Sequence, residues 1–139
     1  IPPEIGQLQD VVYLQLNGLE LAMLPPEIGT LKNLKTIDLA RNRLTTLPAT
    51  FWNLTQLEVL YLNGNRLTQV PPEAANLKQL KHLYLNANPL HQMSKTDWDF
   101  LKAFKNLESL HLYGCKLTPE IIDYIRTLVP AECDVLGDI

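Results

Sequence analysis

The sequence predicts an α/β fold: a right-handed solenoid that forms a horseshoe segment, with a concave parallel β-sheet, a mostly irregular or short helical convex side, and a C-terminal helical cap. Three observations predict it. Leucine supplies 28 of the 139 residues. An 11-residue string recurs along nearly the whole chain at an almost constant step. A Leu-x-Leu pair within the string has period 2, which places both side chains on one face of a short strand. A unit this short cannot bury its apolar face alone, so successive units are expected to stack.

The strings are in register over most of the chain. Each reads apolar-x-x-apolar-x-Leu-x-x-Asn-x-Leu, and the copy over residues 57–67 is the most regular. The first four follow at a 23-residue step, and the fifth begins 27 residues after the fourth. They start at Val11, Leu34, Leu57, Leu80 and Leu107. Residues 1–10 match the second half of a further repeat. We therefore expect one domain over 1–139 whose N-terminus is truncated, with the parent protein continuing upstream.

The asparagine of each string lies where the predicted strand ends and the chain turns away. A buried amide at that point can bond the otherwise unpaired backbone groups of neighbouring turns. Asn42, Asn65 and Asn88 are therefore predicted to form a structural ladder. Leu19 and Cys115 replace asparagine in the first and last copies, so we expect the ladder to cover only the middle repeats.

Two stretches depart from the repeat and predict helices. Residues 94–104 contain the four-residue insertion, with Ser94 as a candidate N-cap and apolar residues at helical spacing, which predicts a true helix on the convex side. Thr118 as N-cap and Pro119 at the first helical position predict a second helix that ends before Pro130. Residues 133–136 alternate weakly and could add a final edge strand. Residues 118–139 are the expected C-terminal cap.

The pattern resembles a known family. Residues 24–34 read LPPEIGTLKNL, which is similar to the 23-residue leucine-rich repeats of LPxxIxxL type in many bacterial proteins, in plant intracellular Ras-group-related repeat proteins and in Roco-type GTPases. The match covers roughly residues 1 to 117. Plant receptor kinases usually carry Gly-x-Ile-Pro where this chain has TLP and QVP, which weighs against that group. Vertebrate extracellular members usually carry four-cysteine caps, whereas only Cys133 lies in the expected cap here, which weighs against them too. The resemblance implies binding of proteins or peptides on the concave sheet.

Composition narrows the function classes. Twelve Lys and Arg stand against 15 Asp and Glu, so the chain has no general attraction for phosphate backbones and we expect no nucleic-acid partner. No apolar run is long enough to cross a membrane, and we expect no membrane insertion. No phosphate loop, zinc helix, nucleophile elbow or redox pair is found, so we expect no enzyme activity, no cofactor and no small-molecule ligand. Localisation stays open between cytoplasmic and bacterial secreted, because no signal peptide is visible.

The outward positions of the strands are the candidate binding surface. Four of the five tyrosines and two of the three histidines fall there. Tyrosine gives wide amphipathic contact at low entropic cost, which favours recognition. The alternative is that tall side chains only cover the sheet and stabilise it. The candidate ligand-binding residues are Tyr13, Gln15, Asp38, Tyr61, Asn63, His82, Tyr84, Asn86, His111 and Tyr113. We expect the centre of recognition at Tyr61, Tyr84 and His111, as a continuous aromatic platform.

Three other features favour structural readings. His82 and His111 are expected about 8 Å apart on neighbouring strands, which allows a shared metal, but no further ligand converges there. Cys115 and Cys133 are expected to be free thiols. Trp52 stands where other copies have glycine, and we expect it to form an apolar bump on the convex side.

Two functions are consistent with these patterns. The leading hypothesis is a non-catalytic module that recognises a protein or peptide with its concave face. The alternative is a regulatory or substrate-selecting arm of a larger enzyme, such as a ubiquitin ligase or a GTPase, whose catalytic part lies outside residues 1–139.

Overall fold

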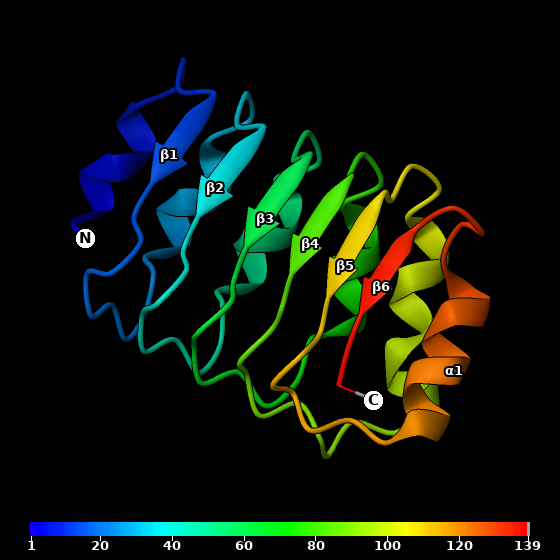
Figure 1. Cartoon of the computed structure of the whole chain (residues 1–139). Helices are drawn as coiled ribbons and strands as arrows, with labels where there is room; N and C mark the ends of the chain where they lie inside the picture. Colours follow the sequence, from blue (N-terminus) through cyan, green and yellow to red (C-terminus); the bar gives the residue numbers. More distant parts are fainter. Residues whose placement is uncertain (139) are drawn as a thin grey trace.

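Six short strands form one parallel sheet in the computed structural model, which describes residues 1–138 (Figure 1). The strands are adjacent in sequence order, and equivalent repeat positions face each other in every pair. Their bounds are Tyr13–Gln15 (β1), Thr36–Asp38 (β2), Val59–Tyr61 (β3), His82–Tyr84 (β4), Ser109–His111 (β5) and Asp134–Leu136 (β6). The predicted right-handed solenoid with a concave parallel sheet is confirmed.

The core lies between the sheet and the convex segments. The central residue of each inner strand points into it, and Ile37, Leu60, Leu83 and Leu110 are at most 3% exposed. Aromatic residues from the convex side, among them Phe51, fill the space opposite. The period-2 alternation of the sequence therefore has a direct physical counterpart, because it directs every second side chain of a strand away from water.

Short 3-10 helices return the chain along the convex side, behind the sheet in Figure 1. Their bounds are Pro3–Gln7 (η1), Pro26–Thr30 (η2), Ala49–Asn53 (η3), Pro72–Asn76 (η4) and Lys95–Ala103 (η5). Proline opens η1, η2 and η4, where the first turn needs no backbone N–H. Gly29 of η2 lies so close to η3 that a Cβ atom there would be 2.3 Å from the carbonyl oxygen of Thr50.

The four-residue insertion forms the predicted helix, but as a longer 3-10 helix. Helix η5 has nine residues where the other convex helices have five. Its start is fixed by Asp97, whose carboxylate accepts the backbone N–H of Ser94 at 2.8 Å. Trp98 and Leu101 are completely buried. The insertion thus lengthens the 3-10 helix that each repeat has on the convex side, and it adds apolar residues to the core.

The prediction that Trp52 forms an apolar bump on the convex side is wrong. The side chain is only 4% exposed and packs edge to face against Phe51, with ring centroids 5.2 Å apart. The indole lies toward the next repeat, where the small side chains of Val70 and Ala74 leave room for it. A tryptophan at a glycine position therefore fills space between two repeats, which its position in the sequence did not reveal.

The C-terminal helix α1 (Pro119–Leu128) begins as predicted, with the Thr118 hydroxyl accepting the N–H of Ile121 at 3.3 Å. The hydroxyl of Tyr124 donates to the carboxylate of Asp99 at 2.7 Å and joins α1 to η5. Strand β6 then pairs with β5 and completes the sheet. Ile139, the last residue of the expected cap, lies outside the described residues. No helix among residues 1–138 is long and apolar enough to span a membrane.

The first repeat is the most exposed part of the described chain. Six of the eight exposed large hydrophobic residues lie within the first 23 positions, and helix η1 contains no buried residue. Leu8 is 50% exposed. We expect the amides of residues 1–10 to exchange hydrogen much faster than those around β3, because few apolar contacts oppose local opening. Hydrogen exchange read by mass spectrometry checks this, and equal protection at both places in a monomer would contradict it.

Candidate functional site

The three ladder asparagines are buried at the ends of β2, β3 and β4. Asn65 is representative: its amide oxygen accepts the N–H of Leu44 at 3.0 Å, and its amide nitrogen donates to the carbonyl oxygens of Leu39 at 2.9 Å and Leu62 at 3.0 Å. Asn42 and Asn88 bond in the same manner. These contacts hold successive repeats together beneath the turns, so the asparagines are not available to a ligand.

The last position of the ladder is occupied by a thiol. Sγ of Cys115 donates to the carbonyl oxygen of Leu85 at 3.2 Å, the same type of acceptor that the asparagines use. The ladder therefore extends one repeat further than expected, with one hydrogen bond in place of three. At the other end, Leu19 is 54% exposed and has no polar side-chain group to offer.

The candidate binding residues lie in three parallel rows across the sheet. The pairing register places the first two, and hydrogen bonds between successive turns continue the third. The first row is Tyr13, Thr36, Val59, His82, Ser109 and Asp134. The middle row is Gln15, Asp38, Tyr61, Tyr84, His111 and Leu136. The third row follows the strands and contains Asn17, Ala40, Asn63, Asn86 and Tyr113.

Three rings of the middle row are in direct contact. Tyr61 and Tyr84 stack with centroids 4.5 Å apart and ring planes 9° from parallel. His111 meets Tyr84 edge-on at 4.5 Å, and Tyr113 lies 5.9 Å from His111. The two tyrosine rings cover each other's faces along the sheet, so they stand on edge and present ring edges and hydroxyl groups outward. The expected platform is thus a row of upright rings, not a flat aromatic surface.

Two of the ring side chains in this row, Tyr61 and His111, are uncharged around pH 7. Burial raises the pKa of Tyr61, and the neighbouring Tyr84 and Asp38 raise it further, so its hydroxyl stays protonated. Burial lowers the pKa of His111, and the nearby His82 adds to this, so the imidazole stays uncharged at neutral pH. The Tyr61 hydroxyl and the His111 imidazole therefore act as uncharged hydrogen-bonding groups.

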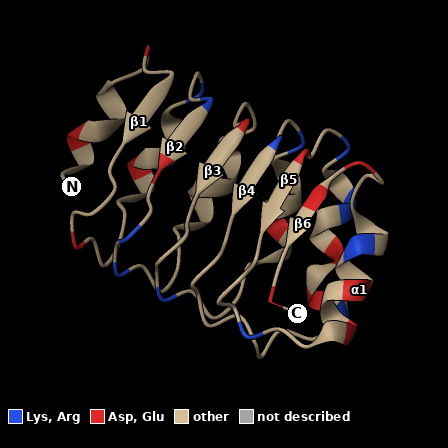
Figure 2. Cartoon of the chain, viewed as in Figure 1, with Lys and Arg blue, Asp and Glu red and all other residues tan. Residues whose placement is uncertain are grey.

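Hydrogen-bond acceptors without a partner lie beside this row. The amide oxygens of Asn63 and Asn86 are buried and have no hydrogen-bond donor. Asp38 is half-buried, and only its Oδ1 has a recorded partner, the N–H of Ala40 at 3.0 Å. None of the three rows contains Lys or Arg. Figure 2 shows the basic residues in the turns and at the strand ends, with the face of the sheet largely free of them. Within the described chain, the face thus offers three acceptor atoms without a donor: the amide oxygens of Asn63 and Asn86, and Oδ2 of Asp38.

The two histidines of these rows and the two cysteines each lie in an environment of their own. Nδ1 of His82 is 2.7 Å from Oγ of Ser109, so this imidazole has a structural partner within the first row. No group of three or more potential metal-ligating side chains converges among residues 1–138. Cys115 and Cys133 are free, and burial raises the pKa of each thiol to about 11, which leaves them weak nucleophiles.

The family is decided by comparison with known proteins. A family model described as "Leucine-rich repeat region" matches residues 3–129. The chain belongs to the leucine-rich repeat family. A solved leucine-rich repeat protein of Leptospira interrogans is 31% identical over 100% of this chain and 40% of its own, with a TM-score of 0.74. A comparison with curated proteins found no significant match.

Two Listeria monocytogenes structures share the fold at lower identity. Internalin C2 is 20% identical over 98% of this chain and 55% of its own, with a TM-score of 0.78. The internalin InlF is 18% identical over 99% and 50%, with a TM-score of 0.72. The chain therefore spans about half the length of the solved repeat proteins it resembles, or less.

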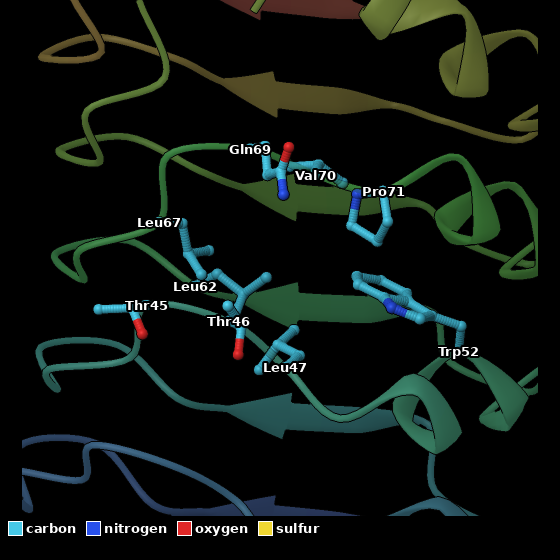
Figure 3. Close-up of a pocket in the computed structure, with 9 residues that line it drawn as sticks. All are labelled: Thr45, Thr46, Leu47, Trp52, Leu62, Leu67, Gln69, Val70 and Pro71. Carbon is cyan, nitrogen blue, oxygen red and sulfur yellow. The ribbon is translucent and has the colours of Figure 1, made fainter. Parts of the chain in front are cut away.

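The repeat fold also encloses a small pocket beside Trp52 (Figure 3). It lies between two neighbouring repeats and has a volume of about 160 Å³. Its walls are mostly apolar, with Leu47, Val70 and Pro71 facing the indole, and Gln69 at its rim. Pockets that hold drug-sized ligands usually measure about 300–1,000 Å³. The space is therefore better explained as imperfect packing around a tryptophan that replaces glycine.

The structure separates the predicted residues into a contiguous group and outliers. Asp38, the Tyr61–Tyr84–His111 row, Asn63 and Asn86 lie together on β2 to β5 and the turns that follow. Tyr13, Gln15 and Tyr113 are exposed on the same face, and His82 is engaged with Ser109. Asp134 and Asp138 of the C-terminal segment extend the face and were missed, because their repeat lacks the string that defined the others.

Proposed function

We propose that this leucine-rich repeat chain is a non-catalytic recognition module that binds an extended protein segment across the concave face. The leucine-rich repeat fold is one that serves protein interaction. The observation that supports a site on this face is the contiguous row of Tyr61, Tyr84 and His111, with the unpaired amide oxygens of Asn63 and Asn86 alongside.

The chemistry of the row fits an extended backbone. A peptide in extended conformation presents N–H donors at regular intervals, and buried acceptors without partners gain most from such donors. Tyrosine hydroxyls can donate to peptide carbonyls and also accept from N–H groups. Upright rings give apolar contact between these polar points. The face therefore combines the aromatic anchors and the hydrogen-bonding groups that recognition of a peptide needs.

The test is a double variant, Tyr61→Ala with Tyr84→Ala, used beside the wild-type chain to recover partners from a lysate of its source. We expect the affinity for at least one partner to fall by about thirtyfold or more, because truncating an aromatic anchor costs at least about 2 kcal/mol of binding free energy. Both side chains lie on the sheet surface and outside the core, so thermal melting should stay close to wild type. Quantitative mass spectrometry of the captured proteins measures the effect.

A matched control removes apolar surface elsewhere. Leu19→Ala with Met23→Ala deletes two exposed side chains, 54% and 76% accessible, from the first repeat. This variant is expected to keep every partner that depends on the middle row. Retention of all partners by a folded Tyr61/Tyr84 variant would contradict the proposal, as would equal losses in the control variant.

A further inference from the structure

The rings of Tyr61, Tyr84 and His111 form a row, called the ring row below, that ends on β3 with Tyr61. The surroundings of Tyr61 indicate what this end of the row binds. One face of Tyr61 is covered by Tyr84, and its other face looks toward β2. The residue in register with Tyr61 on β2 is Asp38, whose charge is close enough to perturb the tyrosine hydroxyl. The face of Tyr61 that Tyr84 does not cover and the carboxylate of Asp38 therefore lie beside each other on neighbouring strands.

Asp38 has no cationic partner within the described chain. Four ion pairs form among residues 1–138, and none of them includes it. Oδ1 accepts the N–H of Ala40, and Oδ2 has no recorded partner. A cation that pairs with a half-buried carboxylate is screened less by water than one at a fully exposed site, so the attraction between the two charges is stronger.

Two further features point to the same place. The amide oxygen of Asn63, two residues after Tyr61, is buried without a donor. Its neighbour in the third row is Ala40, which has only a methyl group and so leaves the approach to Asp38 and Asn63 unobstructed by a long side chain. The site therefore has two acceptor groups, Asp38 and Asn63, that lack a full set of donors, it carries no positive charge, and it borders the face of Tyr61 that Tyr84 does not cover.

Resting on the proposed function, we infer that Asp38, Tyr61 and Asn63 hold an arginine side chain of the bound segment. A guanidinium group is planar and always charged, and it carries five N–H donors in a fixed fork. It can bond Asp38 through two parallel hydrogen bonds, stack on the face of Tyr61 that Tyr84 does not cover, and donate to Asn63 with a remaining N–H. A lysine ammonium supplies the charge but neither the planar stacking nor the fork.

The test uses a phage-displayed library of random dodecapeptides selected on the wild-type chain. We expect the selected peptides to share an arginine and to lose binding on the Tyr61→Ala, Tyr84→Ala variant. The best peptide is then synthesised with arginine and with citrulline, which has the same shape but no charge. Citrulline should weaken binding to the wild-type chain by about tenfold or more, since hydrogen bonds between charged groups are the strong ones.

The same two peptides are then measured on the variant Asp38→Asn, which makes the comparison a double-mutant cycle. Asparagine can still accept the N–H of Ala40, so the local turn is kept. On this variant the arginine and citrulline peptides should bind within about threefold of each other, because the partner of the charge is gone. Asp134→Asn removes a more exposed carboxylate from β6, on the same face of the sheet, and should leave the full difference in place.

The outcomes separate the two proposals. Peptides that need Tyr61 and Tyr84 but bind equally with citrulline would overturn the arginine site and leave recognition on this face intact. An arginine effect that persists in Asp38→Asn would also overturn the site. Failure to select peptides that depend on the ring row would overturn both.

Discussion

Replacing Leu60 or Leu85 with alanine is expected to lower the free energy of unfolding by about 2 to 5 kcal/mol each. Leu60 lies at the centre of β3 and is 1% exposed, and Leu85 directly follows β4 and is completely buried. Each side chain is surrounded by leucines of the repeats on both sides. Because those repeats are held in register by the ladder, the cavity left by truncation cannot close easily. Chemical denaturation followed by circular dichroism measures the loss.

The control for this prediction is Leu19→Ala. Leu19 belongs to the first repeat string, yet it is 54% exposed because no described strand precedes β1. The same substitution should therefore cost well under 1 kcal/mol there. Losses below about 1 kcal/mol at Leu60 and Leu85, or a similar loss at Leu19, would show that burial across the sheet has been misassigned.

The fold could be predicted from the sequence because every repeat must bury the same apolar positions against its neighbours. The two leucines of the Leu-x-Leu pair must share one face of a strand, and a constant 23-residue step favours the same register for successive strings. Thr118 and Pro119 similarly mark the start of α1 through local hydrogen bonding and proline geometry. The strand alternation and the helix start are short-range rules, and the regular step repeats the first of them along the chain.

Features that depend on packing between repeats could not be predicted. Trp52 folds into the core because small residues of the next repeat make room, and nothing near it in the sequence reports that. The outward positions predicted which residues share the face, but not that Tyr61 and Tyr84 stack upright. Nor did they predict that the amide of Asn63 lacks a partner while that of Asn65, two positions later, is fully bonded.

One asparagine of the ladder should contribute as much to the free energy of unfolding as one core leucine. We expect Asn65→Leu to lower the free energy of unfolding by about 3 to 5 kcal/mol. The substitution leaves the buried N–H of Leu44 without an acceptor, which costs about 1–3 kcal/mol, and removes two further hydrogen bonds of about 1 kcal/mol each. The carbonyl oxygens of Leu39 and Leu62 keep one donor each, from Asn42 and Asn88 respectively, which limits the loss.

The chain supplies a closely matched control in Asn63→Leu. This is the same substitution two residues earlier, at an amide whose buried oxygen has no hydrogen-bond partner. It breaks no recorded side-chain hydrogen bond and removes an unsatisfied polar atom, so it should change stability by less than about 1 kcal/mol in either direction. Urea denaturation of both variants gives the comparison directly. Equal losses at the two positions would mean that the asparagines act through volume alone, whereas a large loss at Asn65 only assigns the stability to the hydrogen bonds that join the repeats.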